Sequence, residues 1–288
     1  MPTHHVEGVL EVIGPEAHQA PLVVDSPHSG TIYPPDNLMI VPQEVLTSGT
    51  DLYVHELFAS CVNHGATLLH ALFPRMYIDP NRAADDLDPS LIDGTWPGKL
   101  RPTEKSESGF GLMRRLALPN VPVYERPLPV AEIQMRLDRY YWPYHRTLST
   151  LLDEHQDRFG AVWHLDCHSM KPVGNAMNTD AGEPRPDVVL GNRHGQSCSA
   201  DFTAFVTERF EAEGLTIALN QPYAGAELTE AYSNPDTGRH SLQIELNRGL
   251  YLDDKTYERS SGFDALVGAI DRVCEAIADY ALASARSR

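Results

Sequence analysis

Three short apolar runs in this chain each deliver a side chain that handles metal ions or protons. Residues 163–170 (WHLDCHSM) end near His168, residues 22–30 (LVVDSPHSG) lead to His28, and residues 242–248 (LQIELNR) contain Glu245. Short apolar runs of this kind are typical of buried strands, and open α/β sheets keep their chemistry at the carboxyl ends of their strands. The pattern predicts a metallohydrolase site assembled from strand ends.

Strand-like and helical segments alternate along the chain. Strands are predicted at residues 10–13, 22–25, 67–72, 76–79, 162–166, 188–190, 216–219 and 242–246. Helices are predicted at about 51–63, 130–158 and 200–213, and a last helix carries one apolar stripe from Phe263 to Tyr280. This alternation predicts an α/β fold in which helices cover both faces of the sheet.

One segment, residues 85–128, fits neither the strand period nor the helix period. It contains six prolines and four glycines. A long insertion of this kind inside a compact domain is more often a lid or a binding loop than a structural necessity. We therefore expect a single domain, residues 1–288, in which this insertion passes over the active site.

The chain is acidic and carries no block of basic residues, with a formal net charge of −17 over 288 residues. Nucleic acid and membrane surfaces are therefore not expected as partners, and an anionic small substrate needs locally placed arginines. Neither a signal segment nor a membrane-spanning stretch is recognisable, so a soluble, cytoplasmic protein is expected. No C-x-x-C pair indicates a disulfide framework or a cysteine zinc site, and Cys167 is expected to be a core residue.

His28 and His168 are the candidate metal ligands. Zinc hydrolases commonly hold the metal with two histidines and a carboxylate, and leave one position open for water. Asp25 and Asp166 precede these histidines by three and two residues. Aspartates so placed favour a metal site, because a ligating imidazole needs an acceptor that fixes its tautomer.

The residues alone leave the third ligand open. Asp51 opens a predicted helix, so a helix cap explains it as well as a metal ligand does. Asp25, His55 and Glu56 compete with it for the role.

Glu245 is the candidate catalytic base. By strand alternation it shares one face with Gln243 and Asn247. A carboxylate in a sheet must be paired, metal-bound or poised for proton transfer, because leaving it unsatisfied is costly. A salt bridge to Arg239 or Arg248 would give Glu245 a purely structural role instead.

The chain resembles the N-formylglutamate amidohydrolase family of histidine degradation, also called N-formylglutamate deformylase, which is related to zinc carboxypeptidases. The segments that carry the resemblance run in the family's order from Asp25 to Tyr251: DSPHSG, GTD, DPNR, DCHSM, VLGNRHG, NxPYxG and QIELNRGLY. The resemblance implies a mixed, mostly eight-stranded sheet between helices. It also implies hydrolysis of N-formyl-L-glutamate to L-glutamate and formate, with zinc or another divalent metal as cofactor.

The same resemblance implies a role for each metal-site residue. It makes His28 and His168 zinc ligands. Carboxypeptidases place a glutamate ligand three residues after the first histidine, where this chain has Thr31. The GTD segment therefore makes Asp51 the best candidate for the third ligand.

The resemblance also implies how a small acidic N-acyl amino acid is handled. It makes Glu245 the base and proton shuttle, and Asn81 and Arg82 look like the Asn-Arg pair with which carboxypeptidases hold a substrate carboxylate. Glutamate has two carboxylates and calls for two cationic anchors, for which bidentate guanidinium groups are suited. Arg82 and Arg193 are the predicted anchors.

Three other functions compete with this one. The first is a zinc amidase that acts on another N-acyl amino acid or on a peptidoglycan-type peptide. The second is a non-catalytic metal- or ligand-binding protein, against which the combination of Glu245 with both histidines argues. The third is a serine hydrolase centred on Ser26 or Ser169, which lacks a G-x-S-x-G elbow. The sequence leaves the acyl group, the native metal and the oligomeric state open.

Overall fold

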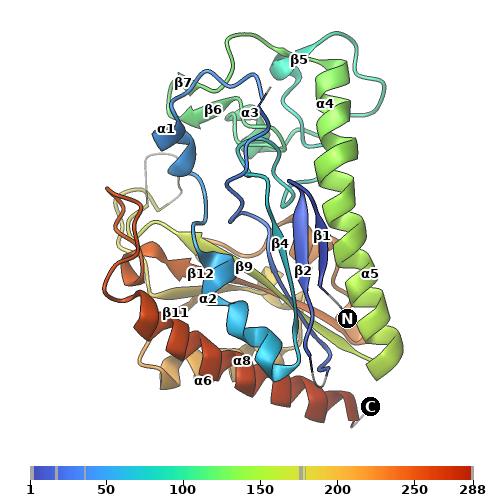
Figure 1. Ribbon diagram of the computed structural model, residues 1–288, viewed down its shortest axis with the longest axis vertical. Helices are drawn as coiled ribbons and strands as arrows, with labels where there is room; N and C mark the ends of the chain where they lie inside the picture. Colours follow the sequence, from blue (N-terminus) through green and yellow to red (C-terminus); the bar gives the residue numbers. More distant parts are fainter. Residues whose placement is uncertain (1–2, 17–18, 36, 175–177, 179, 287–288) are drawn as a thin grey trace.

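An eight-stranded mixed sheet forms the centre of the computed structural model, which describes residues 3–16, 19–35, 37–174, 178 and 180–286 (Figure 1). Its strand order is β1-β2-β4-β3-β9-β12-β10-β11. The strands are β1 (His4–Val6), β2 (Leu10–Ile13), β3 (Leu22–Ser26), β4 (Thr67–Ala71), β9 (Val162–Met170), β10 (Val188–Gly191), β11 (Ile217–Leu219) and β12 (Arg239–Asn247). The central strands β4, β3, β9 and β12 run parallel, whereas β1, β2 and β10 pair with antiparallel neighbours. The predicted mixed α/β sheet is confirmed.

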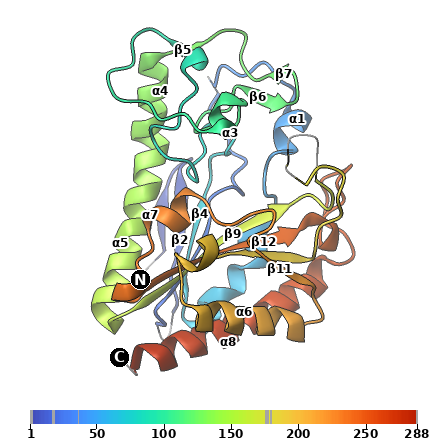
Figure 2. The ribbon, with the colours of Figure 1, turned by 180° about the vertical axis from the view of Figure 1, so that it is seen from behind.

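Helices cover both faces of the sheet, as Figures 1 and 2 show. One face packs against α2 (Val54–Leu57), α6 (Ala200–Ala212) and α8 (Phe263–Arg286), and the other against α5 (Trp142–Phe159), which continues α4 (Val130–Arg136) through the π-helical turn η3 (Leu137–Tyr141). The remaining helices are α1 (Gln43–Thr47), α3 (Glu104–Glu107) and α7 (Glu227–Ala231). The 3-10 turns are η1 (Ala59–His64), η2 (Pro89–Leu91), η4 (Arg193–Gly195), η5 (Pro235–Thr237) and η6 (Arg248–Leu250). Among the described helices, none is long and apolar enough to cross a membrane.

Side-chain alternation along β9 and β12 separates a core face from a site face. Leu165 and Cys167 of β9 pack into the cluster formed with α6 and α8, which confirms Cys167 as a core residue. His168 and Glu245 therefore project from the opposite face of the sheet. The parallel pairing of β9 with β12 places these two residues directly side by side.

Residues 85–128 form short elements that lie beyond the sheet, next to α4 (Figure 1). They include β5 (Ile92–Asp93), β6 (Leu116–Leu118), β7 (Val121–Pro122) and the beginning of β8 (Leu128–Pro129), together with η2 and α3. Their buried side chains, among them Leu87, Leu112 and Val123, join the same apolar cluster as β2, β4 and α5. The insertion is therefore packed onto the body of the protein.

Two predicted elements differ from the structure. Residues 76–79 are not a strand: Tyr77 N–H donates to the carbonyl of Pro74 in a turn, and Asp79 N–H donates to Leu112 in the insertion. Their apolar side chains are buried because the turn lies under the insertion, which gives the same sequence pattern as a buried strand. Residues 51–63 form not one helix but the short helix α2 followed by η1, and β1 is an additional edge strand.

Candidate metal and catalytic site

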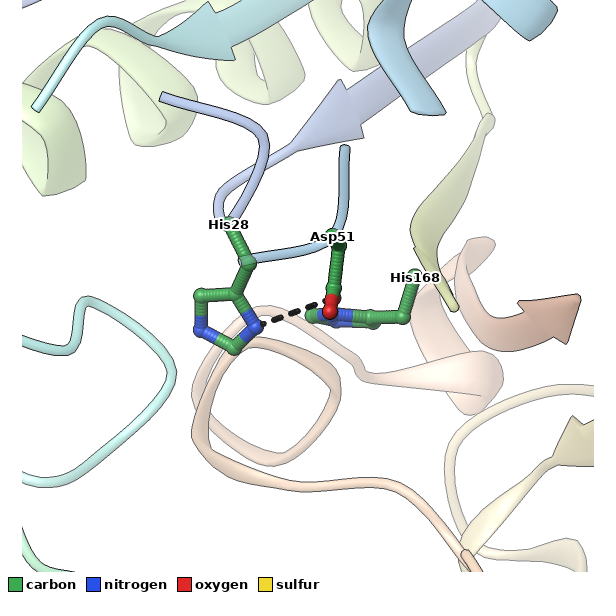
Figure 3. A group of neighbouring side chains, drawn as sticks. All are labelled: His28, Asp51 and His168. Carbon is green, nitrogen blue, oxygen red and sulfur yellow. Dashed lines mark hydrogen bonds and ion pairs between the residues drawn. The ribbon is translucent and has the colours of Figure 1, made fainter. Parts of the chain in front are cut away.

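His28, Asp51 and His168 meet at the carboxyl ends of the central strands (Figure 3). His28 follows β3, Asp51 precedes α2, and His168 lies near the end of β9. Nδ1 of His168 lies 3.2 Å from Oδ2 of Asp51, and Nδ1 of His28 lies 3.5 Å from the same oxygen. The structure therefore brings together the three predicted metal ligands, and all three are buried.

The Nε2 atoms of His28 and His168, which face away from Asp51, each lie next to a carboxylate. Nε2 of His28 lies 2.6 Å from Oδ1 of Asp79, and Nε2 of His168 lies 2.6 Å from Oδ1 of Asp166. A carboxylate accepts a hydrogen bond from Nε2–H, which fixes the tautomer and leaves the Nδ1 lone pair for a metal. Both Nδ1 atoms point to Asp51, so all three potential donor atoms face one point.

The unpaired ring nitrogen of His28 and the types of the three side chains also fit a bound metal ion. Nδ1 of His28 is buried and has no hydrogen-bond partner. A buried polar atom without a partner is rare and calls for an explanation. Two imidazoles and one carboxylate are the donor set of many catalytic zinc sites, which keep a further position for water or substrate.

Asp25 does not hold His28, contrary to the sequence-based expectation. Oδ1 of Asp25 lies 2.9 Å from Nε2 of His164, and Oδ2 accepts a hydrogen bond from Tyr144 at 2.6 Å. Nδ1 of His164 lies 2.7 Å from Oγ of Ser241. Asp25 lies within β3 beside β9, whereas His28 lies beyond the turn that follows β3, where Asp79 is closer. The Ser241–His164–Asp25 chain resembles a catalytic triad but is fully buried, so no substrate reaches it.

Asp51 is not a helix cap. The residue at the N-cap of α2 is Tyr53, and no side chain caps this helix. Oδ1 of Asp51 instead accepts a hydrogen bond from Arg248 Nη2 at 2.8 Å. Burial acts to raise the pKa of Asp51, but the adjacent imidazoles of His168 and His28 and the charge of Arg248 hold it well below its ordinary value. Asp51 is therefore an ionised carboxylate at the meeting point of the two histidines.

His55 and Glu56, which compete with Asp51 for the role of third ligand, lie away from this point. His55 stacks on His70, with 4.6 Å between the ring centroids. Glu56 forms an ion pair with Arg259 near the surface. Neither belongs to the cluster of potential ligands.

Glu245 lies beside the candidate metal ligands without an ion-pair partner among the described residues. Oε1 accepts a hydrogen bond from Gln243 Nε2 at 2.9 Å. Arg248 is paired with Asp51, and Arg239 with Asp153, so neither arginine forms the salt bridge that would make Glu245 structural. Burial raises the pKa of Glu245 to about 7, which is the range suited to a general base near neutral pH.

Glu245 and both histidines line an inner cavity of about 140 Å³. This inner cavity shares Asn81, Arg82 and Lys105 of its wall with an outer cavity of about 1250 Å³. The inner cavity has room for a small molecule only, and the outer cavity connects it with the surface. The site is therefore a narrow pocket at the bottom of a wide mouth.

The two members of the predicted Asn-Arg pair differ in their contacts. Asn81 Oδ1 accepts a hydrogen bond from Leu228 N–H at 2.8 Å, and its Nδ2 donates to Oδ2 of Asp166 at 3.0 Å. The guanidinium of Arg82 forms no hydrogen bond or ion pair with the described residues, and its Nε is buried without a partner. Arg82 therefore has free donors at the cavity wall, whereas Asn81 is largely occupied in positioning Asp166.

Arg193 lies apart from the inner cavity. Its Nη2 is 2.8 Å from Oε2 of Glu230, and Arg193 lines neither the inner nor the outer cavity. Within the part of the chain that the structure describes, the candidate serine nucleophiles have no histidine partner: Oγ of Ser26 lies 2.9 Å from Oγ of Ser29, and Ser169 accepts a hydrogen bond from Arg248. The geometry therefore gives no support to a serine hydrolase.

Two residues of the candidate site are not predicted from the sequence. Asp79 falls in a segment predicted as a strand, although its position at the start of the DPNR segment, two residues before Asn81, marks it as a site residue. Lys105 lies in the insertion, and only the expectation that this insertion passes over the active site points towards it. No local pattern distinguishes Lys105 from an ordinary surface lysine.

Comparison with known proteins gives one consistent relationship. The sequence model of the family described as N-formylglutamate amidohydrolase matches residues 20–252. A crystal structure of N-formylglutamate amidohydrolase from Ralstonia eutropha JMP134 is 41% identical, has a TM-score of 0.93, and covers 96% of this chain and 99% of that one.

Two curated relatives agree. The N-formylglutamate deformylase of Pseudomonas aeruginosa is 28% identical over 255 residues, which is 85% of this chain and 87% of that protein. The N-formylglutamate deformylase of Pseudomonas putida is 27% identical over 245 residues, which is 81% of this chain and 82% of that protein.

Proposed function

This chain belongs to the N-formylglutamate amidohydrolase family, and we propose that it hydrolyses N-formyl-L-glutamate to L-glutamate and formate with a bound zinc ion. The observation that carries the proposal is the position of Glu245, which lies next to the buried His28–Asp51–His168 cluster in one small cavity. Hydrolysis of an N-acyl amide on an acidic amino acid requires a metal site, a carboxylate base and a cation that binds the substrate carboxylate, and this pocket combines residues suited to all three roles.

His28, Asp51 and His168 would hold the zinc. Zinc in such a site acts as a Lewis acid and lowers the pKa of bound water. Asp79 and Asp166 keep the two imidazoles in the orientation and tautomer that ligation needs. In the proposed metal site, His28, Asp51 and His168 would therefore bind the ion, and Asp79 and Asp166 would hold the two histidines in position.

Glu245 moves the proton in the proposed reaction. Its carboxylate accepts a proton from the attacking water as the new C–O bond forms at the formyl carbon. The same group then returns this proton to the amide nitrogen as the C–N bond breaks, which releases formate and the amine of glutamate. A carboxyl group with a pKa near neutrality is suited to both transfers.

Arg82 is the proposed anchor for one substrate carboxylate. Its unpaired guanidinium lines the inner cavity, and planar guanidinium groups bind carboxylates by two parallel hydrogen bonds. Asn81 also lines the inner cavity and keeps Asp166 in place through the hydrogen bond from its Nδ2 group. Arg193 is the second anchor expected from the sequence, but its pairing with Glu230 favours a different cation for that role.

A second candidate function is a zinc amidase for a larger N-acyl amino acid or a peptide. The outer cavity of about 1250 Å³ favours it, because this volume exceeds what N-formylglutamate fills. Initial rates on N-formylglutamate, N-acetylglutamate and N-formylglutamyl peptides decide between the two functions. A preference for the peptides would replace the proposed substrate.

Metal content tests the site itself. We expect about one zinc per chain in the purified protein, and loss of metal in His28→Ala and in His168→Ala. His5→Ala is the matched control, because His5 lies exposed on β1. Full metal occupancy in both site variants would refute the ligand assignment.

A further inference from the structure

The insertion brings one lysine to the wall of the inner cavity. Lys105 lies on α3, and this short helix is fixed by its neighbours. Thr103 N–H donates to Oδ1 of the buried Asp86 at 2.8 Å, and Leu112 N–H donates to the carbonyl of Asp86 at 3.0 Å. Asp86 follows Arg82 by four residues, so the segment that carries Lys105 is held to the segment that carries Arg82.

Lys105 and two arginines form a group of cations without anionic partners. No ion pair or hydrogen bond joins the side chain of Lys105, Arg82 or Arg114 to an acidic group among the described residues, and Nε of both arginines is buried without a partner. By contrast, Arg75 is paired with Asp79 and Arg248 with Asp51. The site therefore holds more positive charge than its own carboxylates neutralise by direct contact.

Electrostatic repulsion within this group is visible in its pKa values. Lys105 is exposed to solvent, and the nearby charge of Arg82, more than desolvation, lowers its pKa to about 8. Burial and the charges of Arg75 and Arg82 lower the pKa of Arg114 to about 9. Two unpaired cations, Arg82 and Lys105, that line one small cavity in a chain with a net charge of −17 indicate a site that is completed by an anionic ligand.

We propose that Lys105 binds the second carboxylate of the substrate and so sets the specificity of the enzyme for acidic N-formyl amino acids. This inference rests on the proposed function, and it assigns the insertion, residues 85–128, a role in substrate binding. Arg82 and Lys105 both line the inner cavity, so one can bind each carboxylate of a dianionic substrate. Arg114 lines neither cavity, and it contributes positive potential without contact.

The test compares Lys105→Met with Lys99→Met. Lys99 is, like Lys105, an exposed lysine of the insertion, but it lines neither cavity, so its replacement removes the same charge without touching the site. We expect Lys105→Met to raise KM for N-formylglutamate and to lower the ratio of kcat/KM for N-formylglutamate to that for N-formylglutamine by about ten- to a hundredfold. Lys105→Arg should restore part of this ratio, and Lys99→Met should leave it unchanged.

The outcomes separate this inference from the proposed function. A wild-type enzyme that prefers N-formylglutamate, together with a Lys105→Met variant that keeps the full preference and its zinc, would overturn the role of Lys105 and leave the function intact. A zinc-loaded wild-type enzyme that does not hydrolyse N-formylglutamate would overturn the function. Calorimetric binding of N-formylglutamate and N-formylglutamine to wild type and Lys105→Met still decides on Lys105 in that case: an equal affinity loss for both ligands contradicts the inference, and a selective loss for N-formylglutamate supports it.

Discussion

Replacing Asp51 by Asn should weaken metal binding and destabilise the metal-free protein, and the two effects have separate structural causes. Oδ2 of Asp51 faces Nδ1 of both histidines, whereas Oδ1 binds Arg248. A neutral amide is a poor zinc ligand, so metal affinity should fall by about ten- to a thousandfold.

The loss of stability follows from the buried ion pair. The exposed fractions of the Asp51 and Arg248 side chains are 2% and 5%, and 2.8 Å separates Asp51 Oδ1 from Arg248 Nη2. Breaking such a pair outright costs about 3–5 kcal/mol. Asn keeps an oxygen that accepts from Arg248, so we expect a smaller loss of about 1–3 kcal/mol in the free energy of unfolding.

Chelator competition measures the metal affinity of Asp51→Asn, and thermal unfolding with and without zinc measures its stability. Asp86→Asn is a suitable control, because Asp86 is also buried and hydrogen-bonded but lies outside the metal cluster. It should lose stability and keep its zinc. Unchanged zinc affinity in Asp51→Asn would refute the assignment of Asp51 as a ligand, whatever its stability.

Three further predictions test other parts of the site. Glu245→Gln should retain zinc while kcat falls by roughly a hundredfold or more, and near-normal turnover in steady-state assays would require a different base. Asp79→Asn should lower zinc affinity by about ten- to a hundredfold in the same chelator competition, because the neutral amide of Asn accepts the hydrogen bond from His28 Nε2 more weakly and no longer places a negative charge beside the imidazole; an affinity equal to wild type would contradict that role. Since the pKa of Lys105 is lowered to about 8, its positive charge is present below this pH and is lost above it, so kcat/KM for N-formylglutamate should fall as the pH rises through 8. In Lys105→Arg the fall should move to higher pH, and an unshifted profile would assign it to another group.

The sequence alone predicts on which face of the sheet a strand residue lies, because side-chain direction alternates along a strand. His168 and Glu245 lie on one face because alternation in β9 and β12 places them there. The apolar residues next to each of them in the sequence reveal this alternation. The pairing of the strands cannot be predicted from the sequence in this way, because the register depends on which strands become neighbours in the sheet. The direct pairing of Glu245 with His168 is therefore information that only the fold supplies.

Residues placed by turns and loops are harder to predict. The segment that ends at Asp79 reads as a strand because Met76, Tyr77 and Ile78 are apolar, but the insertion buries them in a turn. The position of Lys105 depends on how residues 85–128 fold back over the site, and that arrangement follows from contacts such as Thr103 with Asp86 rather than from any periodic pattern. A sequence motif alone points to Arg193, and the structure places this arginine beside Glu230.

The adjacency of β3, β9 and β12 in the middle of the sheet has a consequence for how the protein matures. These strands come from the early, middle and late parts of the chain, and pairings between such distant segments close slowly. His28 and His168 can meet once β3 pairs with β9, but Glu245 arrives only with β12 near the end of synthesis. A chain that has not yet added β12 can bring the candidate metal ligands together but holds no complete site. Zinc uptake during refolding should therefore report the pairing of β3 with β9, whereas hydrolytic activity should return only once β12 has joined the sheet.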